Sequence, residues 1–414
     1  MISRTKMGDL KHDYVFKEWF VVMDTVNSSW QEGTQIGCGC AQCASGYNDT
    51  TPTYSDRNSS QLENGTSQSF APNSYGTTTQ MVDQLVSGYW DGVGLAQNNW
   101  ALGQTVTYSI SNAYNAAEKA SFRMGFNLWS DTAEITFQEV GSGGSINIIE
   151  GNDSSAWSGN NSWDTTDWPN SLIKTGNTIS IDTDVWPSLS DIGGYGVQTV
   201  LHEIGHSLGL GHQGNYNGSV NYDADVIYLN DNRQYSLMSY NDADKLGTDH
   251  WDASSAWQYA ATPLLYDIAA IQQIYGANMT ARTGATTYGF NITSDVLFAQ
   301  YDLSQHSAPF AIWDAGGVDT LDLSGYVTNQ SITLVAGDFT SAGDMTNNII
   351  IAFGAVIENA VGGSGNDSIY GNDANNIIQG GGGNDWLYAS GGSDQLQGGA
   401  GSDRAVFNYD VSEY

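Results

Sequence analysis

Cysteine is nearly absent from this 414-residue chain: Cys38, Cys40 and Cys43 stand together in CGCAQC, and no other position carries a thiol. No disulfide can therefore form outside that cluster, which excludes the small disulfide-stabilised scaffolds of secreted proteins. Two interpretations of the cluster stay open. A thiolate could occupy a metal site of the same chain and keep it latent, or the cluster could be unpaired or self-bridged and have no catalytic role.

Basic residues and long apolar runs are also scarce. The chain has 12 Lys and Arg against 45 Asp and Glu, a formal charge of −33, which excludes nucleic acid and anionic membranes as partners. No stretch reaches the roughly 18 apolar residues of a membrane span. The opening MISRTKMGDLKHDYVFKEWF lacks an uninterrupted apolar run, so we expect no cleaved N-terminal signal peptide.

Composition divides the chain into three regions. Residues 1–80 are expected to form a leader or propeptide-like region, because Ser, Thr, Asn and Gly are abundant between 44 and 79. The pattern then changes from helical to strand-and-turn near residues 277–285. We therefore expect one domain over 81–277 and a second over 278–414.

The stretch LHEIGHSLGLGH, residues 201–212, holds three of the six histidines. Apolar residues before and within it recur every three or four positions, which predicts a helix with His202 and His206 on one face. Gly209 can end the helix in a left-handed conformation and return His212 to the same point. Three imidazoles and one open position predict a catalytic zinc site, with Glu203 as general base. Five matched positions of H-E-x-x-H-x-x-G-x-x-H argue against the alternative, ordinary helix histidines.

A second segment, YSLMSY at residues 235–240, supplies the methionine turn expected under the metal in zinc proteases with this longer motif. Without the histidine motif, Met238 and Tyr240 would be interpreted as ordinary core packing.

The rest of the first domain is typical of an α+β arrangement with a mixed sheet. TVTYSI and ITFQEV alternate like strands, and Phe122, Phe126 and Trp129 between them follow one helical face. A further helix, PLLYDIAAIQQIYG, is expected to end at Gly276 behind the site.

From Gly362 the sequence repeats in nine-residue blocks: GGSGNDSIY, GNDANNIIQ, GGGGNDWLY, ASGGSDQLQ and GGAGSDRAV. Turn glycines, an acid at the sixth position and an apolar residue at the eighth predict a parallel β-roll that binds calcium. Composition alone would favour a disordered linker, which the constant period argues against. The expected calcium ligands in the repeats are Gly363, Gly365, Asp367, Asn376, Gly381, Gly383, Asp385, Asp394, Gly399, Gly401 and Asp403.

With these segments, and with RTGATTYGF and IWDAGGVDTLDLSGY, the chain resembles the serralysins, secreted bacterial zinc endopeptidases of the metzincin clan, over roughly residues 85–410. The resemblance implies an α+β metzincin catalytic domain followed by an all-β parallel β-roll of RTX repeats, with one catalytic Zn²⁺ and several structural Ca²⁺. It also implies that Tyr240 is an extra zinc ligand that can swing towards the transition state. GGSINIIEG, residues 143–151, would be the edge strand that pairs with an extended substrate.

At the domain junction the resemblance implies two further calcium sites, several of whose ligands would act through backbone carbonyls. The implied ligands are Arg282, Gly284, Thr286, Asp314, Gly316, Gly317, Asp319 and Glu358. An extracellular protein stabilised by calcium rather than by disulfides fits the lack of cysteine.

The resemblance implies protein and peptide substrates, a proteinaceous inhibitor, and secretion by a one-step bacterial exporter that reads an uncleaved C-terminal signal. We expect a monomer. The chain departs from the family because it stops at FNYDVSEY, just after the last repeat, so we expect either a fragment or altered export.

The predicted reaction is peptide hydrolysis, in which Glu203 passes a proton from water to the leaving nitrogen while zinc and Tyr240 hold the oxyanion. The alternatives are a catalytically silent calcium-binding scaffold or adhesin, a permanently latent zymogen, and an astacin. An intact Glu203 argues against the first. The missing signal peptide and disulfides argue against the last.

Overall fold

The computed structural model describes residues 36–40, 74–92, 97–164, 172–186, 188–292 and 299–407. Cys43 and most of the expected leader lie outside these residues. The backbones of Cys38 and Cys40 lie in strand β1 (Ile36–Cys40).

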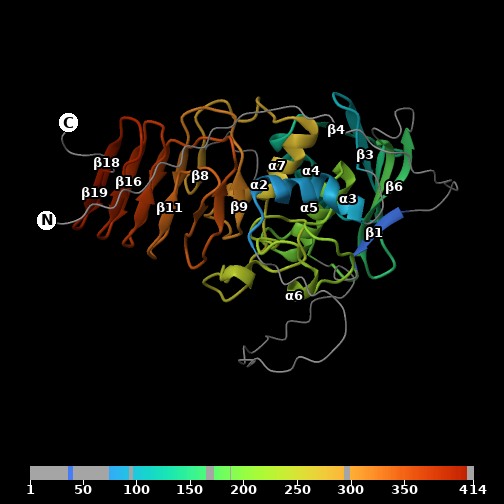
Figure 1. Ribbon diagram of the computed structural model, residues 1–414, viewed down its shortest axis with the longest axis horizontal. Coiled ribbons are helices and arrows are strands. Elements are labelled where there is room, and N and C mark those ends of the chain that lie inside the picture. Colours follow the sequence, from blue (N-terminus) through green and yellow to red (C-terminus); the bar gives the residue numbers. More distant parts are fainter. Residues whose placement is uncertain are drawn as a thin grey trace, which may run out of the picture. The chain divides into compact units, whose positions relative to one another are not determined.

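A seven-stranded mixed sheet forms the first domain (Figure 1). Its strands are β1, β2 (Asn98–Asn99), β3 (Thr105–Ile110), β4 (Thr136–Glu139), β5 (Ile146–Glu150), β6 (Ala156–Asp164) and β7 (Leu172–Ile181). They lie in the order β1-β6-β7-β5-β3-β4, with β2 beside β7. Strands β4, β3, β5 and β7 run parallel, whereas β6 runs antiparallel to β7 and β1 antiparallel to β6.

The sequence prediction that residues 143–151 form the edge strand of this sheet was wrong. Strand β5 lies inside the sheet, hydrogen-bonded to β3 on one side and to β7 on the other. Strand β6 lies further out, and among the described residues β1 lies beyond it. Alternating apolar residues indicate that one face of a strand is buried, but they do not tell whether it has one neighbour or two, because backbone pairing leaves the side-chain pattern unchanged.

Two long helices pack together beside the sheet. Helix α4 (Ala116–Thr132) begins with a capping box, in which Asn115 accepts hydrogen bonds from the backbone of Glu118 and the Glu118 carboxylate accepts one from the backbone of Asn115. Its buried face includes the predicted Phe122, Phe126 and Trp129. Helix α5 (Tyr195–Leu208) is buried from Gly196 onwards, because α4 covers one side and β6 and β7 another.

The remaining helices enclose α5. Helix α7 (Leu265–Tyr275) ends at Gly276, as predicted. Sequence patterns did not indicate α2 (Thr78–Asp83), the π-helical turn Gln84–Gly88 or α3 (Tyr89–Gly92), yet Met81 and Leu85 within them are fully buried. The short helices α6 (Tyr222–Asp225) and Ala243–Leu246 lie in the loops after α5.

The second domain is built from short, mostly parallel strands (Figure 1). One sheet contains β8 (Thr287–Gly289), β10 (Thr320–Asp322), β14 (Asn359–Val361), β16 (Ile377–Gly382) and β18 (Gln395–Ala400); another contains β11 (Ser331–Thr333), β15 (Ser368–Tyr370), β17 (Trp386–Tyr388) and β19 (Arg404–Val406). A third contains β9 (Phe310–Ile312), β12 (Phe339–Thr340) and β13 (Ile349–Ile351).

The register of these strands confirms the predicted β-roll. Ile369 on β15 pairs with Leu387 on β17, and Ile378 on β16 pairs with Leu396 on β18, so two nine-residue blocks make one turn of the roll. The eighth-position residues Ile369, Ile378 and Leu387 are buried between the two sheets.

Candidate metal centre and active site

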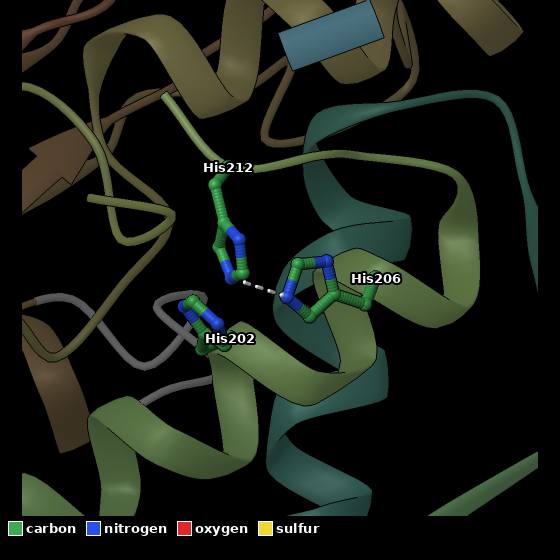
Figure 2. A group of neighbouring side chains, drawn as sticks. All are labelled: His202, His206 and His212. Carbon is green, nitrogen blue, oxygen red and sulfur yellow. Dashed lines mark hydrogen bonds between the residues drawn. The ribbon is translucent and has the colours of Figure 1, made fainter. Parts of the chain in front are cut away.

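Three histidines meet at the end of α5. His202 and His206 lie one turn apart on the helix, and Gly209 ends it with a φ of 111°. The chain then turns and brings His212 over the other two, as Figure 2 shows. Their ring nitrogens offer three candidate ligand atoms, all within 4.8 Å of one another. Within the described ranges, no other group of three His, Cys, Asp or Glu side chains could hold a metal in this way.

Hydrogen bonds orient all three imidazoles. The Nδ1 atoms of His202, His206 and His212 each lie 2.8 Å from a backbone carbonyl, namely those of Leu237, Leu210 and Tyr216. A carbonyl can only accept, so each Nδ1 carries the hydrogen and each Nε2 keeps a lone pair.

The Nε2 atoms fit a tetrahedral cation. The Nε2 atoms of His206 and His212 are 3.1 Å apart, close to the roughly 3.3 Å that two 2.0–2.1 Å zinc bonds at a tetrahedral angle would give. His202 Nε2 is buried and has no hydrogen-bond partner among the described residues. Two lone pairs facing each other at this distance repel unless a cation lies between them.

Burial also sets the charge of the three rings. Desolvation lowers the pKa of His202 to about 4 and holds the pKa values of His206 and His212 well below the usual 6.5. The imidazoles are therefore neutral at pH 7, which is the form that binds a metal.

The methionine turn, residues 235–240, packs against the helix that carries His202 and His206. Leu237, whose carbonyl orients His202, and Ser236 both donate to the carboxylate of Asp267 on α7, at 2.7 and 2.6 Å. Met238 then packs against α5 at Gly205: a Cβ added to this glycine would lie 2.9 Å from the methionine sulfur. The backbone of Leu264 donates to the same carboxylate, at 2.9 Å.

A second buried carboxylate supports the other side. Asp231 accepts hydrogen bonds from the hydroxyls of Tyr216 (2.8 Å) and Ser239 (2.6 Å), and the Tyr216 oxygen accepts the backbone N–H of Tyr240 (3.3 Å). The carbonyl of Tyr216 orients His212. Desolvation raises the pKa of Asp231 to about 6 and does the same for Asp267. Sequence patterns did not identify either residue, because a single Asp outside a motif carries no signal of burial.

The two proposed catalytic side chains are buried beside the histidines. Glu203 is fully buried on α5, next to His202. The ring centroid of Tyr240 lies 4.4 Å from that of His212 and 6.0 Å from that of His202. Both side chains thus lie near the three histidines, and their catalytic roles stay predictions.

In the roll, the sixth-position residues link successive turns. One carboxylate oxygen of Asp385, Asp394 or Asp403 accepts a backbone N–H one turn earlier, from Asp367, Asn376 or Asp385 respectively. The other oxygen of Asp385 is buried and has no hydrogen-bond partner among the described residues. Asn376 uses its amide to donate to the carbonyl of Glu358, at 2.8 Å.

The turn glycines bring the backbones of successive turns close together. Gly381 and Gly399 have φ values of 98° and 99°, and a Cβ on either would collide with the carbonyl of the equivalent glycine in the turn before. The other glycines expected as ligands, Gly363, Gly365, Gly383 and Gly401, lie in the same stacked turns. Carbonyl and carboxylate oxygens with a buried, unpartnered oxygen are a donor set that suits Ca²⁺.

At the junction the structure brings together the residues implied as calcium ligands. Asp319 accepts the backbone N–H of Thr286 at 2.7 Å, and Glu358 accepts that of Asp319 at 2.8 Å. The second oxygen of Asp319 is buried and has no hydrogen-bond partner among the described residues. Asp314 accepts the N–H of Gly316, and Gly317 approaches the carbonyl of Gly284. These contacts connect the three carboxylates to neighbouring backbone groups, and their role as calcium ligands stays a prediction.

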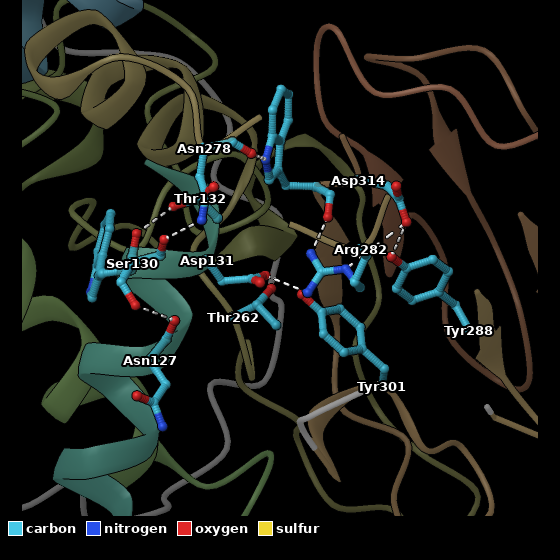
Figure 3. Close-up of polar contacts among 12 residues, drawn as sticks. Asn127, Ser130, Asp131, Thr132, Thr262, Asn278, Arg282, Tyr288, Tyr301 and Asp314 are labelled. Atoms are coloured by element: carbon cyan, nitrogen blue, oxygen red, sulfur yellow. Dashed lines mark hydrogen bonds and ion pairs between the residues drawn. The ribbon is translucent and has the colours of Figure 1, made fainter. Parts of the chain in front are cut away.

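The side chain of Arg282 also has a structural role that the sequence did not indicate. Its guanidinium forms an ion pair with Asp131 of α4 at 2.5 Å, and it also donates to the carbonyl of Trp313 (Figure 3). Tyr288 and Tyr301 flank it, with ring centroids 5.8 and 5.7 Å from the guanidinium carbon. A cavity of about 950 Å³ opens beside this pair. The side chain of Arg282 thus joins the two domains, whatever its carbonyl binds.

Comparison with known proteins agrees with this geometry. Residues 99–248 match the family model described as matrixin, of peptidase family M10, and residues 277–413 match the model for the M10 serralysin C terminus. The fold class is therefore confirmed: an α+β metzincin domain followed by a parallel β-roll. Together the matches cover more than half of the chain, and the chain belongs to the serralysin family.

Individual named proteins are also similar in sequence to this chain. Metallopeptidase AprA of Pseudomonas marginalis is 42% identical over 279 residues, 64% of this chain and 56% of the relative. Serralysin A of Dickeya chrysanthemi is 43% identical over 260 residues, 61% and 53%. Serralysin G of the same organism is 39% identical over 321 residues, 73% and 66%. The chain thus spans between about half and two thirds of the length of these relatives. Among the described helices, none has the length and apolar character needed to cross a bilayer.

Proposed function

We propose that this chain is a secreted zinc endopeptidase that hydrolyses proteins with a metal-activated water. The observation that carries the proposal is the convergence of three Nε2 lone pairs on one point, each fixed by a carbonyl at the opposite ring nitrogen. Zinc is the cation expected for three neutral imidazoles with an open position. The names of the relatives, metallopeptidase and serralysin, agree with this activity.

His202, His206 and His212 would hold the metal, with Tyr240 as the additional ligand. When bound, zinc supplies a Lewis acid and lowers the pKa of a bound water. Glu203 accepts a proton from the attacking water and donates it to the leaving nitrogen. The hydroxyl of Tyr240 donates a hydrogen bond to the oxyanion. Because Glu203 is fully buried, its carboxylate acts where bulk water is excluded.

The position of strand β6 favours a protein or peptide as the substrate. Helix α5, which carries the histidines, packs against β6, so an extended chain paired with β6 would pass close to the metal. Within the chain itself, β1 pairs antiparallel with β6, with Cys38 opposite Ser158. The β6 backbone can therefore accept an extended strand, and a peptide substrate would bind in the same way.

The same pairing supports a second candidate function, a latent zymogen. Residues 36–40 occupy the β6 edge that a substrate would use, so an uncleaved leader would compete with substrate. Removal of the leader by limited proteolysis should then raise activity. An activity that is the same before and after cleavage would contradict latency without affecting the proposed peptidase.

Calcium would stabilise the C-terminal domain. The buried oxygens of Asp319 and Asp385 and the stacked glycine carbonyls support several Ca²⁺ sites in the roll and at the junction. Because the chain carries a charge of −33, bound cations would also relieve repulsion between carboxylates.

Casein hydrolysis in the presence of calcium, with and without 1,10-phenanthroline, tests the proposed function. Zinc content is measured on the same sample by elemental analysis. We expect one zinc per chain, loss of activity with the chelator and recovery with added zinc. One bound zinc without activity, even after removal of the leader, would instead favour a calcium-dependent scaffold.

A further inference from the structure

The C-terminal end of α5 is held by side chains from several distant segments. The last carbonyls of a helix have no partner within it, and here they lie between the second and third candidate zinc ligands. Side chains from β7, the segment after β2, α7 and α3 donate to them. The donors are Lys174 to the carbonyls of His206 (2.8 Å) and Ser207 (2.9 Å), Trp100 to Ser207 (2.9 Å), Tyr275 to Leu208 (2.7 Å) and Trp90 to Gly209 (2.8 Å).

Lys174 is the unusual member of this set. It lies on β7 with 1% of its surface exposed, and its ammonium group forms no ion pair with a carboxylate of the described residues. Burying an unpaired cation is costly, and burial accordingly lowers the pKa of Lys174 well below its usual value of 10.5. The partial negative charge at the helix C-terminus, together with two carbonyl acceptors, offsets that cost.

The position of Lys174 links the substrate edge to the metal site. On β7 it pairs with Trp163 of β6, the strand proposed to bind substrate. Its ammonium group holds the carbonyl of His206, where the chain leaves the helix and turns towards His212. One side chain thus connects the sheet to the turn between two candidate ligands.

We propose that Lys174 is a positioning residue for the zinc site: it holds the turn from His206 to His212 so that the third imidazole reaches the metal. This inference rests on the proposed function. It concerns geometry rather than folding, because the two carbonyls keep other donors: Gly209 donates to His206 at 3.1 Å, and Trp100 donates to Ser207. Loss of the lysine would leave neither carbonyl unpaired.

The test substitutes Lys174→Met in the full chain and measures zinc affinity by competition with a chelator. Methionine fills a similar volume without a charge or a donor. Loss of the charge alone would tighten zinc binding, because a cation repels Zn²⁺. Loss of positioning would weaken binding, and we expect a weakening of about tenfold, the scale on which groups behind the ligands affect metal affinity. The sign of the change therefore separates the two effects.

Two further readouts sharpen the test. The visible spectrum of the Co²⁺-substituted protein should change in Lys174→Met, because it reports ligand geometry, and kcat should fall with little change in KM. Lys174→Gln, which keeps an amide donor, should recover part of the zinc affinity. Lys119→Met, which removes a partly exposed lysine of α4 that donates to Asn112, is the matched control and should leave all three readouts unchanged.

Three results would overturn the proposal. They are zinc binding in Lys174→Met that is equal to or tighter than wild type, an unchanged Co²⁺ spectrum, or loss of fold in both the Met and Gln variants, which would make Lys174 a general structural residue. Failure of the proposed function would look different. The wild-type chain would then bind zinc without hydrolysing casein, while the ratio of zinc affinities between variant and wild type would still report on positioning.

Discussion

The two domains hold their candidate metal ligands in opposite ways. In the first, each ligand depends on groups far away in the sequence: His202 is oriented by Leu237, whose backbone is held by Asp267. In the roll, each group depends on the equivalent residue one turn away, as Asp367 does on Asp385. In the first domain each of these contacts is made once, whereas in the roll the same contact recurs from turn to turn. Single substitutions should therefore be severe in the first domain and mild in the second.

The largest effect should come from the proposed base. Glu203→Gln keeps the shape of the side chain but cannot accept the proton, so kcat should fall by about 10³-fold or more while zinc content stays at the wild-type level. Casein hydrolysis and elemental analysis of the same preparation check this. Retained turnover would show that Glu203 is not the base.

The expected difference between the two domains is tested next at Asp267, the residue that holds the methionine turn. Asp267→Ala leaves the buried donors of Ser236, Leu237 and Leu264 without their acceptor, and we expect a loss of about 3 kcal/mol in unfolding free energy. Urea denaturation of the zinc-loaded protein measures it. Because His202 depends on Leu237, zinc affinity should fall too, and stability within about 0.5 kcal/mol of wild type would contradict the account.

The matching change in the roll is Asp385→Ala. Its neighbours repeat the same contacts with Asp367 and Asp403, so we expect a loss of about 1 kcal/mol that a higher calcium concentration partly restores. Urea denaturation at several calcium concentrations separates it from Asp267→Ala, which calcium should not restore. Equal losses in the two variants would remove the contrast between the domains.

A smaller effect should appear in the pH dependence of calcium binding. Burial, together with the nearby carboxylates of Asp314 and Glu358, raises the pKa of Asp319 to about 7, and burial raises the pKa of Asp367 to about 6. Without calcium, these raised pKa values favour the folded state at low pH, and that stabilisation is lost as pH rises through 6 to 7. Calcium binds the ionised carboxylates, so the calcium concentration at half-saturation should fall as pH rises from about 5.5 to about 8. Calorimetric titration at several pH values measures this, and a flat profile would exclude these carboxyls as ligands.

Sequence patterns predict the parts that repeat or that follow a motif. The helix with His202 and His206, its end at Gly209 and the nine-residue period of the roll all leave a local signal. Strand β6 leaves none, because its sequence AWSGNNSWD is polar and irregular. Asp267, Asp231 and Lys174 could not be predicted either, because burial of a charged residue depends on contacts between segments that are distant in the sequence.

The ion pair between Arg282 and Asp131 has a consequence for cooperativity. It lies where buried apolar side chains form one continuous cluster that extends from Met81 in the first domain to Leu387 in the roll. Separating the domains would break this ion pair and expose part of the apolar surface to water, and the exposure of apolar surface is unfavourable. The domains should therefore melt together in a single calorimetric transition, and calcium bound to the roll would raise the melting temperature of the zinc-binding domain as well.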